Sequence, residues 1–359
     1  MPTIDIVRKY KIPESFRIAQ VRGMFDYQRE SVEHHWKSKL PIEEKEWGIG
    51  LIVGASGSGK TTLAKEAFPS MRFHESFEWS PDNVVVDDFE SDLNIKDITS
   101  MLNSVGLSSP PSWLKPYSVL SNGQKFRAEL ARCILTNKTG IIFDEFTSVI
   151  DRDVAKISCA AISKTLRRKK NPPFIAVSCH YDIIDWLQPD WIFDVGTQQF
   201  DWRERTPRPE ISVKIHKATT SDWRIFREHH YLDHHIHKAA RCFVATINDK
   251  PVGFTSVLHF PHPTSKLMKR EHRTVVLPDF QGVGIGNKLS EFIANYFRNL
   301  GFRFLSVTSA PSMIWHRKNS AKWKIKRFGR ITNISQAGLT SFDSTSSKKR
   351  MTASFEYIG

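Results

Sequence analysis

Two glycine-rich stretches hold the residues best suited to chemistry. The first, GASGSGKTT, spans residues 54–62 and follows the apolar run IGLIV of residues 49–53. A glycine-rich turn lets the backbone wrap phosphate groups, and the N–H groups at a helix N-terminus attract anions. This G-x-x-x-x-G-K-T pattern predicts a nucleoside triphosphate site, in which Lys60 reaches the β- and γ-phosphates and Thr61 ligates Mg²⁺. The predicted ATP contacts in this stretch are Gly54, Ser56, Gly57, Gly59, Lys60, Thr61 and Thr62.

A pair of acids downstream supplies the groups that ATP hydrolysis needs. The run IIFDEF predicts a buried strand that ends at Asp144 and Glu145. In this position Asp144 is suited to hold Mg²⁺, and Glu145 is suited to polarise the attacking water. His180 follows another apolar run, PFIAVSCH, and fits a sensor of the γ-phosphate. We therefore predict Glu145 and His180 as catalytic residues, and Thr61 and Asp144 as the Mg²⁺ ligands.

The second glycine-rich stretch, QGVGIG, spans residues 281–286. A β-branched run precedes it. A predicted amphipathic helix follows it, with one apolar face made of Leu289, Phe292, Ile293 and Phe297. Such a turn exposes backbone N–H groups that bind a pyrophosphate, although a G-x-G taken alone also occurs in dinucleotide-binding turns. The residues predicted to bind the cofactor here are Leu277, which lies just before the stretch, and Gln281, Gly282, Val283, Gly284 and Gly286 within it.

The first 205 residues resemble the ABC ATPase family. The stretch LSNGQ, residues 120–124, is similar to the family signature, with Asn122 in place of the usual glycine, and SVID, residues 148–151, is similar to its D-loop. In this family the signature contacts the γ-phosphate of ATP held by the opposite subunit. The resemblance therefore implies that Ser121, Gly123 and Gln124 bind the ATP of a partner, and that the chain forms a homodimer through its ATPase domains or finds another ABC partner.

Two departures from the family pattern argue against transport. Only 61 residues separate Lys60 from Ser121, so we expect a shortened helical subdomain. The segment NVVVDDFESD has no glutamine where the family carries its Q-loop, although Asp87 or Asp88 could substitute for it. The Q-loop is where ABC transporters couple to their membrane partners. The resemblance therefore favours the soluble members of the family.

The phrase VVLPDFQGVGIG resembles motif A of the GNAT family of N-acyltransferases. The resemblance implies that the turn grips the pyrophosphate of acetyl-CoA, that the preceding strand splays to hold the thioester, and that an amine attacks directly without a metal. Trp323 stands near the position where many members carry a tyrosine that protonates the departing thiolate. The general acid therefore stays open among Asp279, Ser306, His316 and Ser320.

A histidine-rich stretch, REHHYLDHHIH, spans residues 227–237. On a helix, His230 and His234 would share one face, a spacing that can ligate one metal ion. The alternative is that this stretch lines the acceptor site of an acyltransferase. We favour the acceptor site, with His230 and Tyr231 as contacts.

The positive charge is confined to the last part of the chain. Residues 1–210 carry 28 Lys and Arg against 29 Asp and Glu, whereas residues 211–359 carry 24 against 9. A basic domain indicates a polyanionic partner, although net charge also serves solubility. The segment HRKNSAKWKIKRFGR, residues 316–330, interleaves basic side chains with Trp323 and Phe328, as nucleic-acid sites do, or is a strand with a solvated basic face. We predict that the basic C-terminal domain binds nucleic acid.

These inferences define an α/β chain: a P-loop ABC-type nucleotide-binding domain at residues 1–205, a linker at 206–211, and a GNAT mixed α+β acyltransferase domain at 212–359. We predict an ATP-dependent acyl-CoA N-acyltransferase that modifies nucleic acid, with a DNA base favoured over RNA, as in phage DNA-modifying proteins of faintly similar sequence. The alternatives are a protein lysine or N-terminal acetyltransferase regulated by an ABC-type switch, and a non-catalytic nucleic-acid-binding ATPase. The chain has no apolar run of 18 residues, no secretory signal and four scattered cysteines, so we expect a cytoplasmic protein without a membrane partner.

Overall fold

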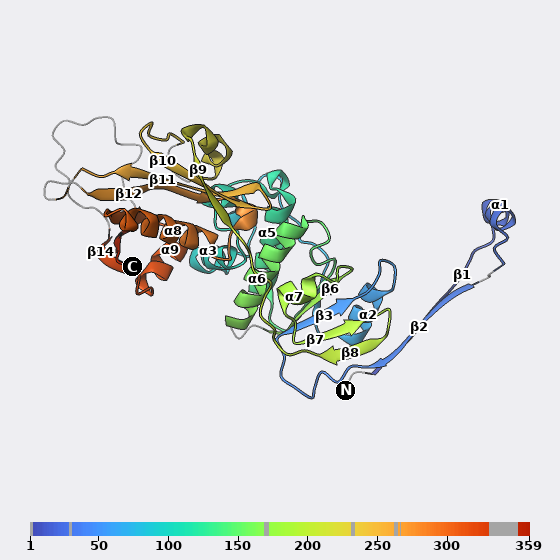
Figure 1. Ribbon diagram of the computed structural model, residues 1–359. Helices are drawn as coiled ribbons and strands as arrows, with labels where there is room; N and C mark the ends of the chain where they lie inside the picture. Colours follow the sequence, from blue (N-terminus) through green and yellow to red (C-terminus); the bar gives the residue numbers. More distant parts are fainter. Residues whose placement is uncertain are drawn as a thin grey trace. The chain divides into compact units, whose positions relative to one another are not determined.

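The chain folds into two compact units, each built from separate stretches of sequence (Figure 1). The computed structural model describes residues 3–28, 31–168, 172–230, 234–261, 265, 267–329 and 351–359. Unit 1 comprises Met1–Phe77, Cys133–Val149 and Ser163–Arg208, and unit 2 comprises Glu78–Arg132, Ile150–Ile162 and Pro209–Gly359. The predicted helical segment before the signature therefore belongs to the same unit as the C-terminal half.

Unit 1 is built on a six-stranded sheet in the order β4-β5-β6-β3-β7-β8. All neighbours are parallel except β7 and β8, which are antiparallel. The residues of β3 are buried at all five positions, as is typical of a central parallel strand. The strands are β3 (Ile49–Val53), β4 (Arg72–His74), β5 (Ile141–Phe143), β6 (Phe174–Ser178), β7 (Trp191–Asp194) and β8 (Gln199–Trp202).

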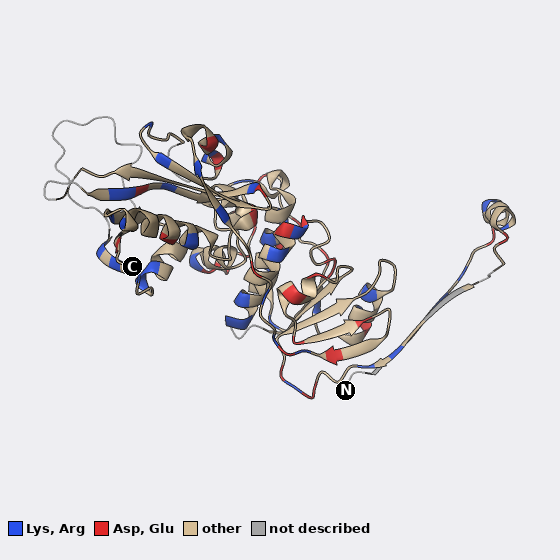
Figure 2. Cartoon of the chain, in the orientation of Figure 1, with Lys and Arg blue, Asp and Glu red and all other residues tan. Residues whose placement is uncertain are grey.

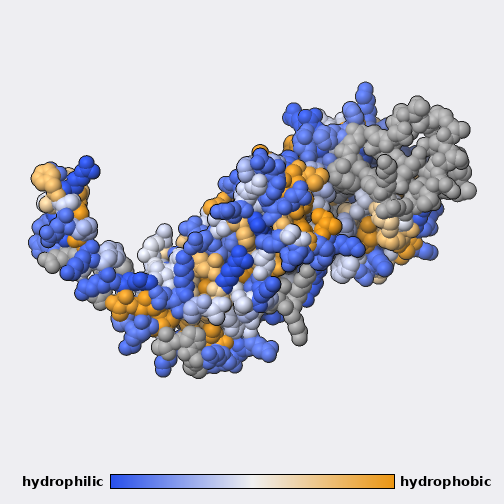
Figure 3. Space-filling view, turned by 180° about the vertical axis from the view of Figure 1, so that it is seen from behind, coloured by the Kyte–Doolittle hydropathy of each residue, from blue (hydrophilic) through white to orange (hydrophobic). Residues whose placement is uncertain are grey.

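Two helices of unit 1 follow central strands of its sheet. Helix α2 (Lys60–Ala67) follows β3, and α7 (Ile183–Leu187) follows β6. A two-stranded antiparallel ribbon, β1 (Thr3–Lys11) and β2 (Ser31–Lys39), precedes them and carries α1 (Phe16–Phe25) between its strands. None of the residues of α1 is buried, and several of its apolar side chains are exposed (Figure 3).

The helical part of unit 2 lies between residues 78 and 162. It contains α3 (Ile95–Ser104), α4 (Pro110–Trp113), and most of α5 (Asn122–Thr136) and α6 (Arg152–Arg168), with the short helices η1 (Val85–Asp87) and η2 (Tyr117–Val119). In the segment without a Q-loop glutamine, Asp88 accepts hydrogen bonds from the backbone N–H of Ser80 and from the Asn83 side chain. Asp88 thus closes a local turn.

A seven-stranded sheet forms the rest of unit 2, in the order β14-β15-β13-β12-β11-β10-β9. Helix α8 (Ile285–Asn299) packs against β11, β12, β13 and β15. Helix α9 (Pro311–Lys318) and the short helices η3 (Thr220–Ile225), η4 (Arg227–His229) and η5 (Pro278–Phe280) complete the unit. The strands are β9 (Lys214–Ala218), β10 (Arg241–Ile247), β11 (Lys250–His259), β12 (Met268–Val276), β13 (Arg303–Thr308), β14 (Trp323–Gly329) and β15 (Thr352–Tyr357).

The apolar face predicted for α8 is confirmed at three of its four positions. Leu289, Ile293 and Phe297 are at most 2% exposed and belong to the core of unit 2. Phe292 is 55% exposed, so its placement on the buried face was wrong. It lies at the margin of the apolar stripe, where the helix surface turns away from the sheet.

The parallel strands β12 and β13 separate part of the way along their length. They pair only between Met268–Arg270 and Arg303–Leu305, which agrees with the splayed strand that the GNAT resemblance implies. Glu271 follows the last pair and forms an ion pair with Arg317, with 3.0 Å between Oε2 and Nη2. Ser306 and Thr274 donate hydrogen bonds to the same carboxylate. Burial raises the pKa of Glu271, but the charge of Arg317 and these hydrogen bonds outweigh burial and leave the pKa below its ordinary value.

The predicted α/β fold class is therefore confirmed. A six-stranded sheet that carries the first glycine-rich turn is followed by a seven-stranded mixed sheet with its own helices. Residues 203–213, which include the predicted linker, contain no helix or strand. Cys133, Cys159 and Cys242 are buried, Cys179 is half-buried, and none of these four cysteines forms a disulfide. Within the described ranges, no helix is long and apolar enough to cross a membrane.

Replacing Arg317 with methionine should destabilise the protein by about 3–5 kcal/mol, because it leaves the buried carboxylate of Glu271 without its partner. The matched control is Arg303→Met, since Arg303 pairs with Glu356 while its side chain is 47% exposed, and its loss should cost below about 1 kcal/mol. Urea unfolding of the full chain measures both values. Equal values for the two variants would contradict the structural role given to the buried pair.

Candidate functional site

The first glycine-rich turn joins β3 to α2, as predicted. Gly59 precedes α2 with a φ of +89°, and a side chain there would come within 2.1 Å of the Trp36 ring. The indole N–H of Trp36 donates to the carbonyl of Ser58 at 3.1 Å. Within the turn, Lys60 Nζ donates to the carbonyl of Ala55 at 2.7 Å. Trp36, which the sequence interpretation did not single out, thus packs against the first glycine-rich turn and bonds to its backbone.

Thr61 and Asp144 meet although 83 positions separate them. Thr61 Oγ1 donates to Asp144 Oδ2 at 2.7 Å, and Asp144 Oδ1 accepts from the Glu145 N–H at 2.8 Å. A hydroxyl and a carboxylate in contact are hard oxygen ligands of the kind that Mg²⁺ takes. The structure therefore brings together the two predicted metal ligands.

Glu145 and His180 follow neighbouring strands. Parallel strands β5 and β6 pair, so their carboxyl ends lie at the same edge of the sheet as that of β3. Ser178 links the two segments, because its hydroxyl donates to the Phe146 carbonyl at 2.9 Å and accepts from the His180 N–H at 3.2 Å. Glu145 is exposed and has a φ of +48°. Both predicted catalytic residues thus lie at the sheet edge that carries the first glycine-rich turn.

The signature stretch forms the start of α5 in unit 2. Ser121 Oγ accepts from the Gln124 N–H at 3.3 Å, and Gln124 Oε1 accepts from the Ser121 N–H at 3.0 Å. This reciprocal pair is a capping box. Gln124 also donates to the Ser112 hydroxyl at 3.1 Å and is buried, whereas Ser121 is exposed. Of the three predicted signature contacts, Gly123 packs against Asp279, since a side chain at Gly123 would come within 2.4 Å of Asp279 Oδ1.

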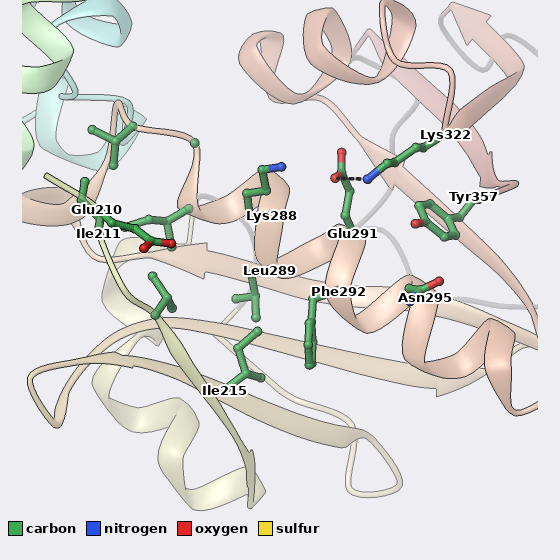
Figure 4. A pocket seen from close by; sticks show the side chains of 15 residues that line it. Glu210, Ile211, Ile215, Lys288, Leu289, Glu291, Phe292, Asn295, Lys322 and Tyr357 are labelled. Atoms are coloured by element: carbon green, nitrogen blue, oxygen red, sulfur yellow. Dashed lines mark ion pairs between the residues drawn. The ribbon is translucent and has the colours of Figure 1, made fainter. Parts of the chain in front are cut away.

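The second glycine-rich turn joins β12 to α8 and opens into a cavity of about 710 Å³ (Figure 4). Gly284 precedes α8 with a φ of +93°, and a side chain there would meet no atom within 4 Å. Val283 and Gly284 line the cavity together with Lys288, Phe292 and Lys322. Its other lining residues are Glu210, Ile211, Val213, Ile215, Ile285, Leu289, Glu291, Asn295, Tyr357 and Gly359.

The first half of the same turn faces elsewhere. Gln281 donates to the carbonyl of Val276 at 2.7 Å and accepts from the Ser108 N–H at 2.7 Å. Gly282 lies against Gly106 and Ala161 in the helical part of the unit. Leu277 N–H donates to the Val252 carbonyl at 2.9 Å. Gln281 and Gly282 are therefore not among the residues that line the cavity, and Gly286 packs against the side chain of Val276.

The candidates for the general acid differ in their burial and in their hydrogen-bond partners. Ser306 is fully buried and bonded to Glu271 and Arg317. His316 contacts Glu291, with 2.8 Å between Nε2 and Oε1. Asp279 lies 3.5 Å from the Ser121 hydroxyl. The identity of the general acid therefore stays open. Trp323, which stands near the position of the family's tyrosine, is 5% exposed and packed against Tyr357.

The histidine-rich stretch is not α-helical at its described residues. The 3₁₀-helix η4 ends at His229, and His230 is extended with a φ of −89° and a ψ of 125°. His230 is buried, with its ring 5.5 Å from that of Trp223. The helical spacing of His230 and His234 was therefore wrong, and the other predicted acceptor contact, Tyr231, lies outside the described residues. Among the residues that the structure covers, no group of three His, Cys, Asp or Glu side chains could hold a metal ion.

The sequence interpretation did not single out Arg127 or Glu271, and it counted Arg317 among the basic side chains of residues 316–330, whereas Arg317 is buried. Arg127 lies within the helix after the signature and is fully buried, and Glu271 and Arg317 form the buried pair where β12 and β13 separate. The sequence offers only a weak signal for Arg127, an arginine among the apolar residues of α5. No sequence pattern indicates the pair of Glu271 and Arg317, because 46 positions separate the two residues.

Comparisons with known proteins give matches to both parts of the chain. Residues 183–316, less than half of the chain, match the model of the Acetyltransferase (GNAT) family, and this match begins upstream of the predicted linker. No curated protein sequence matches significantly. The dimeric post-hydrolysis structure of the ATP-binding cassette MJ0796 bound to ADP and Pi is 14% identical, with a TM-score of 0.39, and the match covers 56% of this chain and 97% of that chain.

Two acetyltransferase structures match the other part. The IAA acetyltransferase from Bacillus cereus is 14% identical with a TM-score of 0.31, over 41% of this chain and 99% of that chain. The Bacillus subtilis acetyltransferase in complex with CoA is 12% identical with a TM-score of 0.31, over 42% of this chain and 99% of that chain. The chain is thus similar to ABC cassettes in one part and to GNAT acetyltransferases in the other, the two families that its motifs resemble.

Proposed function

We propose that this chain transfers an acyl group from acetyl-CoA to an amine of a nucleic-acid base, and that ATP binding by paired ATPase domains controls the transfer. The observation that carries the proposal is the turn of residues 281–286. It starts α8, opens into a large cavity, and follows a strand that separates from its parallel neighbour. Backbone N–H groups at such a helix start bind phosphates.

The cavity has the chemistry that acyl-CoA requires. Lys288 and Lys322 supply positive charge for phosphate groups, and Ile211, Phe292 and Leu289 supply apolar surface for the adenine and the pantetheine arm. Lys322 lies 3.5 Å from Glu291, so an arriving phosphate would compete with that carboxylate for the ammonium (Figure 4). When bound, acetyl-CoA supplies the thioester whose carbonyl carbon accepts the amine.

The chain contributes position rather than a metal or a nucleophile. Beyond Arg270 the ladder between β12 and β13 ends, so backbone groups of β12 can orient the thioester. As the amine attacks, an N–C bond forms and the C–S bond breaks, the amine proton passes to a base or water, and the thiolate takes up a proton. Glu271 is held ionised by Arg317, so it is unsuited to donate that last proton.

ATP is proposed to bind at the turn of residues 54–62, with Mg²⁺ held by Thr61 and Asp144. Glu145 would polarise the attacking water, and His180 would contact the γ-phosphate. Two copies would associate head to tail, so that Ser121, Gly123 and Gln124 of one copy meet the ATP of the other. The hydrogen bond between Thr61 and Asp144 supports this assignment, because two side chains in contact could bind one Mg²⁺ ion together.

The proposed nucleic-acid surface includes strand β14, at the end of the sheet in the described part of the chain (Figure 2). Lys324, Lys326 and Arg327 are exposed on it, and the Phe328 ring is 58% exposed. Exposed cations bind phosphates and an exposed ring can stack on a base. Trp323 and Arg317 are buried, so the predicted stacking role of Trp323 was wrong. Lysines on an edge strand also prevent edge-to-edge pairing, which keeps a protein acceptor as the alternative.

Gly284→Trp should abolish acyl transfer, because an indole at this position would project into the space in front of the turn. The assay mixes the protein with labelled acetyl-CoA, ATP and Mg²⁺, offers duplex DNA, tRNA and a lysine peptide, and reads nucleosides and peptides by mass spectrometry. The matched control is Gly301→Trp, since Gly301 also has a positive φ and open space around it but lies after α8. A mass shift on the peptide alone would replace the nucleic-acid acceptor with a protein, and no shift on any acceptor would remove the transferase proposal.

Reversing the charges of Lys324, Lys326 and Arg327 to glutamate should weaken nucleic-acid binding more strongly at low salt than at high salt. Each lost phosphate contact should lower the slope of log K against log salt by about 0.9 for duplex DNA. Fluorescence anisotropy over a salt series measures this slope. A triple variant of exposed lysines in other segments, Lys96→Glu, Lys138→Glu and Lys164→Glu, controls for net charge. Equal slopes in the two triple variants would rule out β14 as the binding surface.

A further inference from the structure

The segment of residues 277–282 belongs to two candidate sites at once. It leads into the turn of residues 281–286, where we propose that acyl-CoA binds, and we call these residues the acyl-CoA turn. The segment also packs against the signature helix α5 within unit 2. Arg127 of α5 donates hydrogen bonds to the carbonyls of Pro278 and Asp279, the second at 2.6 Å. The same guanidinium donates to the hydroxyl of Ser158 at 3.1 and 3.2 Å. A single side chain therefore holds two consecutive peptide groups of the segment.

Burial makes this arrangement costly unless a negative charge lies close by. Arg127 is 0% exposed. Burial lowers its pKa to about 10, and the nearby charge of Asp279 opposes this shift. The guanidinium therefore stays protonated at neutral pH, and the carboxylate of Asp279 is the negative charge that favours it.

Two backbone contacts join the same surfaces. Gly106 and Gly282 both have a φ of +93°, and a side chain on Gly282 would come within 2.9 Å of the Gly106 Cα. The side chain of Gln281 bridges the Ser108 N–H and the Val276 carbonyl, so it connects the helical part to the end of β12. The two glycine backbones are therefore in direct contact, so a side chain on Gly282 would force the two surfaces apart.

Asp279 lies at the signature motif itself. Its Oδ1 is 3.5 Å from the Ser121 hydroxyl and fills the space beside Gly123, at the N-terminus of α5. An anion that approaches Ser121 and Gly123 from a partner would meet this carboxylate. Two like charges repel at such a distance, so both cannot remain in the same place.

A second link joins the transferase hairpin to the segment that resembles the D-loop. The turn between β10 and β11 contacts the start of α6, where Asn248 donates to Asp153 at 3.0 Å and Lys250 lies 3.4 Å from the same carboxylate. Lys250 also lies 3.8 Å from Asp151. The hairpin of β10 and β11 therefore contacts the last residue of the segment that resembles the D-loop.

We propose that Asp279 takes the place of the γ-phosphate at the signature motif, so that an ATP-loaded second copy of this chain must displace it, and that this displacement weakens acyl-CoA binding at the adjoining turn. The proposal rests on the ATP sandwich of the proposed function and adds the element through which ATP reaches the transferase site. Asp279 and Arg127 act as positioning residues.

The direction of the coupling follows from which state holds the turn in shape. While Asp279 and Arg127 hold the segment, Gly282 and Gly284 are fixed in the conformation that starts α8. Release of the segment would give the turn conformational freedom that acyl-CoA would have to remove on binding. Because linkage is reciprocal, acetyl-CoA should also oppose the ATP-driven dimer.

The test compares Glu145→Gln, which slows hydrolysis, with the double variant Glu145→Gln, Asp279→Asn. Sedimentation velocity with Mg²⁺ and ATP measures the dissociation constant of the dimer. Asparagine keeps the size of aspartate and removes its charge, so we expect tighter dimers by about five- to 150-fold, the usual range for coupled sites. Acetyl-CoA should weaken the dimer of Glu145→Gln and affect the double variant less. The matched control adds Asp92→Asn instead, which removes an exposed charge from the same unit and should leave the dimer unchanged.

Equal dissociation constants for the two Asp279 forms would overturn the proposal, and so would the absence of any ATP-driven dimer. A dimer that acetyl-CoA leaves unchanged in Glu145→Gln would also overturn it. The proposed function fails separately, in the transfer assay: the Asp279 effect can hold with no acyl acceptor found, and acyl transfer can occur with no effect of Asp279.

Discussion

A buried guanidinium is the interaction on which the rest of unit 2 depends. Arg127 has no exposed surface, and two of its partners are backbone carbonyls of the segment that leads to the second glycine-rich turn, residues 281–286. A charge in such surroundings is stable only while its hydrogen bonds and its counter-ion stay in place. The helices between residues 78 and 162 and the seven-stranded sheet therefore belong to one folded unit, although they are far apart in the sequence.

The seven-stranded sheet of unit 2 also contains a buried guanidinium paired with a carboxylate. Strands β12 and β13 separate after three paired residues, which opens the sheet but also leaves polar surface inside the fold. Glu271 and Arg317 fill that space and pair with each other, and the hydroxyl groups of Ser306 and Ser290 form further hydrogen bonds to them. The opening that would admit a thioester is thus maintained by a charge pair instead of by apolar packing.

The sequence predicted the local features of this molecule well. Glycine-rich turns, the strands before them and the helices after them follow from short patterns, as β3, α2 and α8 show. Long-range pairing has no such pattern. Nothing near Gln281 indicates that its side chain bonds to the backbone at Ser108, 173 positions away, and nothing near Trp323 indicates that its ring is buried. Phe292 was misplaced because an amphipathic pattern gives a face but not its margin.

Backbone hydrogen exchange in residues 277–286, followed by mass spectrometry in Glu145→Gln, tests most directly whether ATP acts on the acyl-CoA turn through the signature helix. If ATP displaces Asp279 and releases the segment, amides of this stretch should exchange faster with Mg²⁺ and ATP, and acetyl-CoA should slow them again. Unchanged exchange in this stretch, with clear protection at residues 54–62 as proof of bound ATP, would contradict the account.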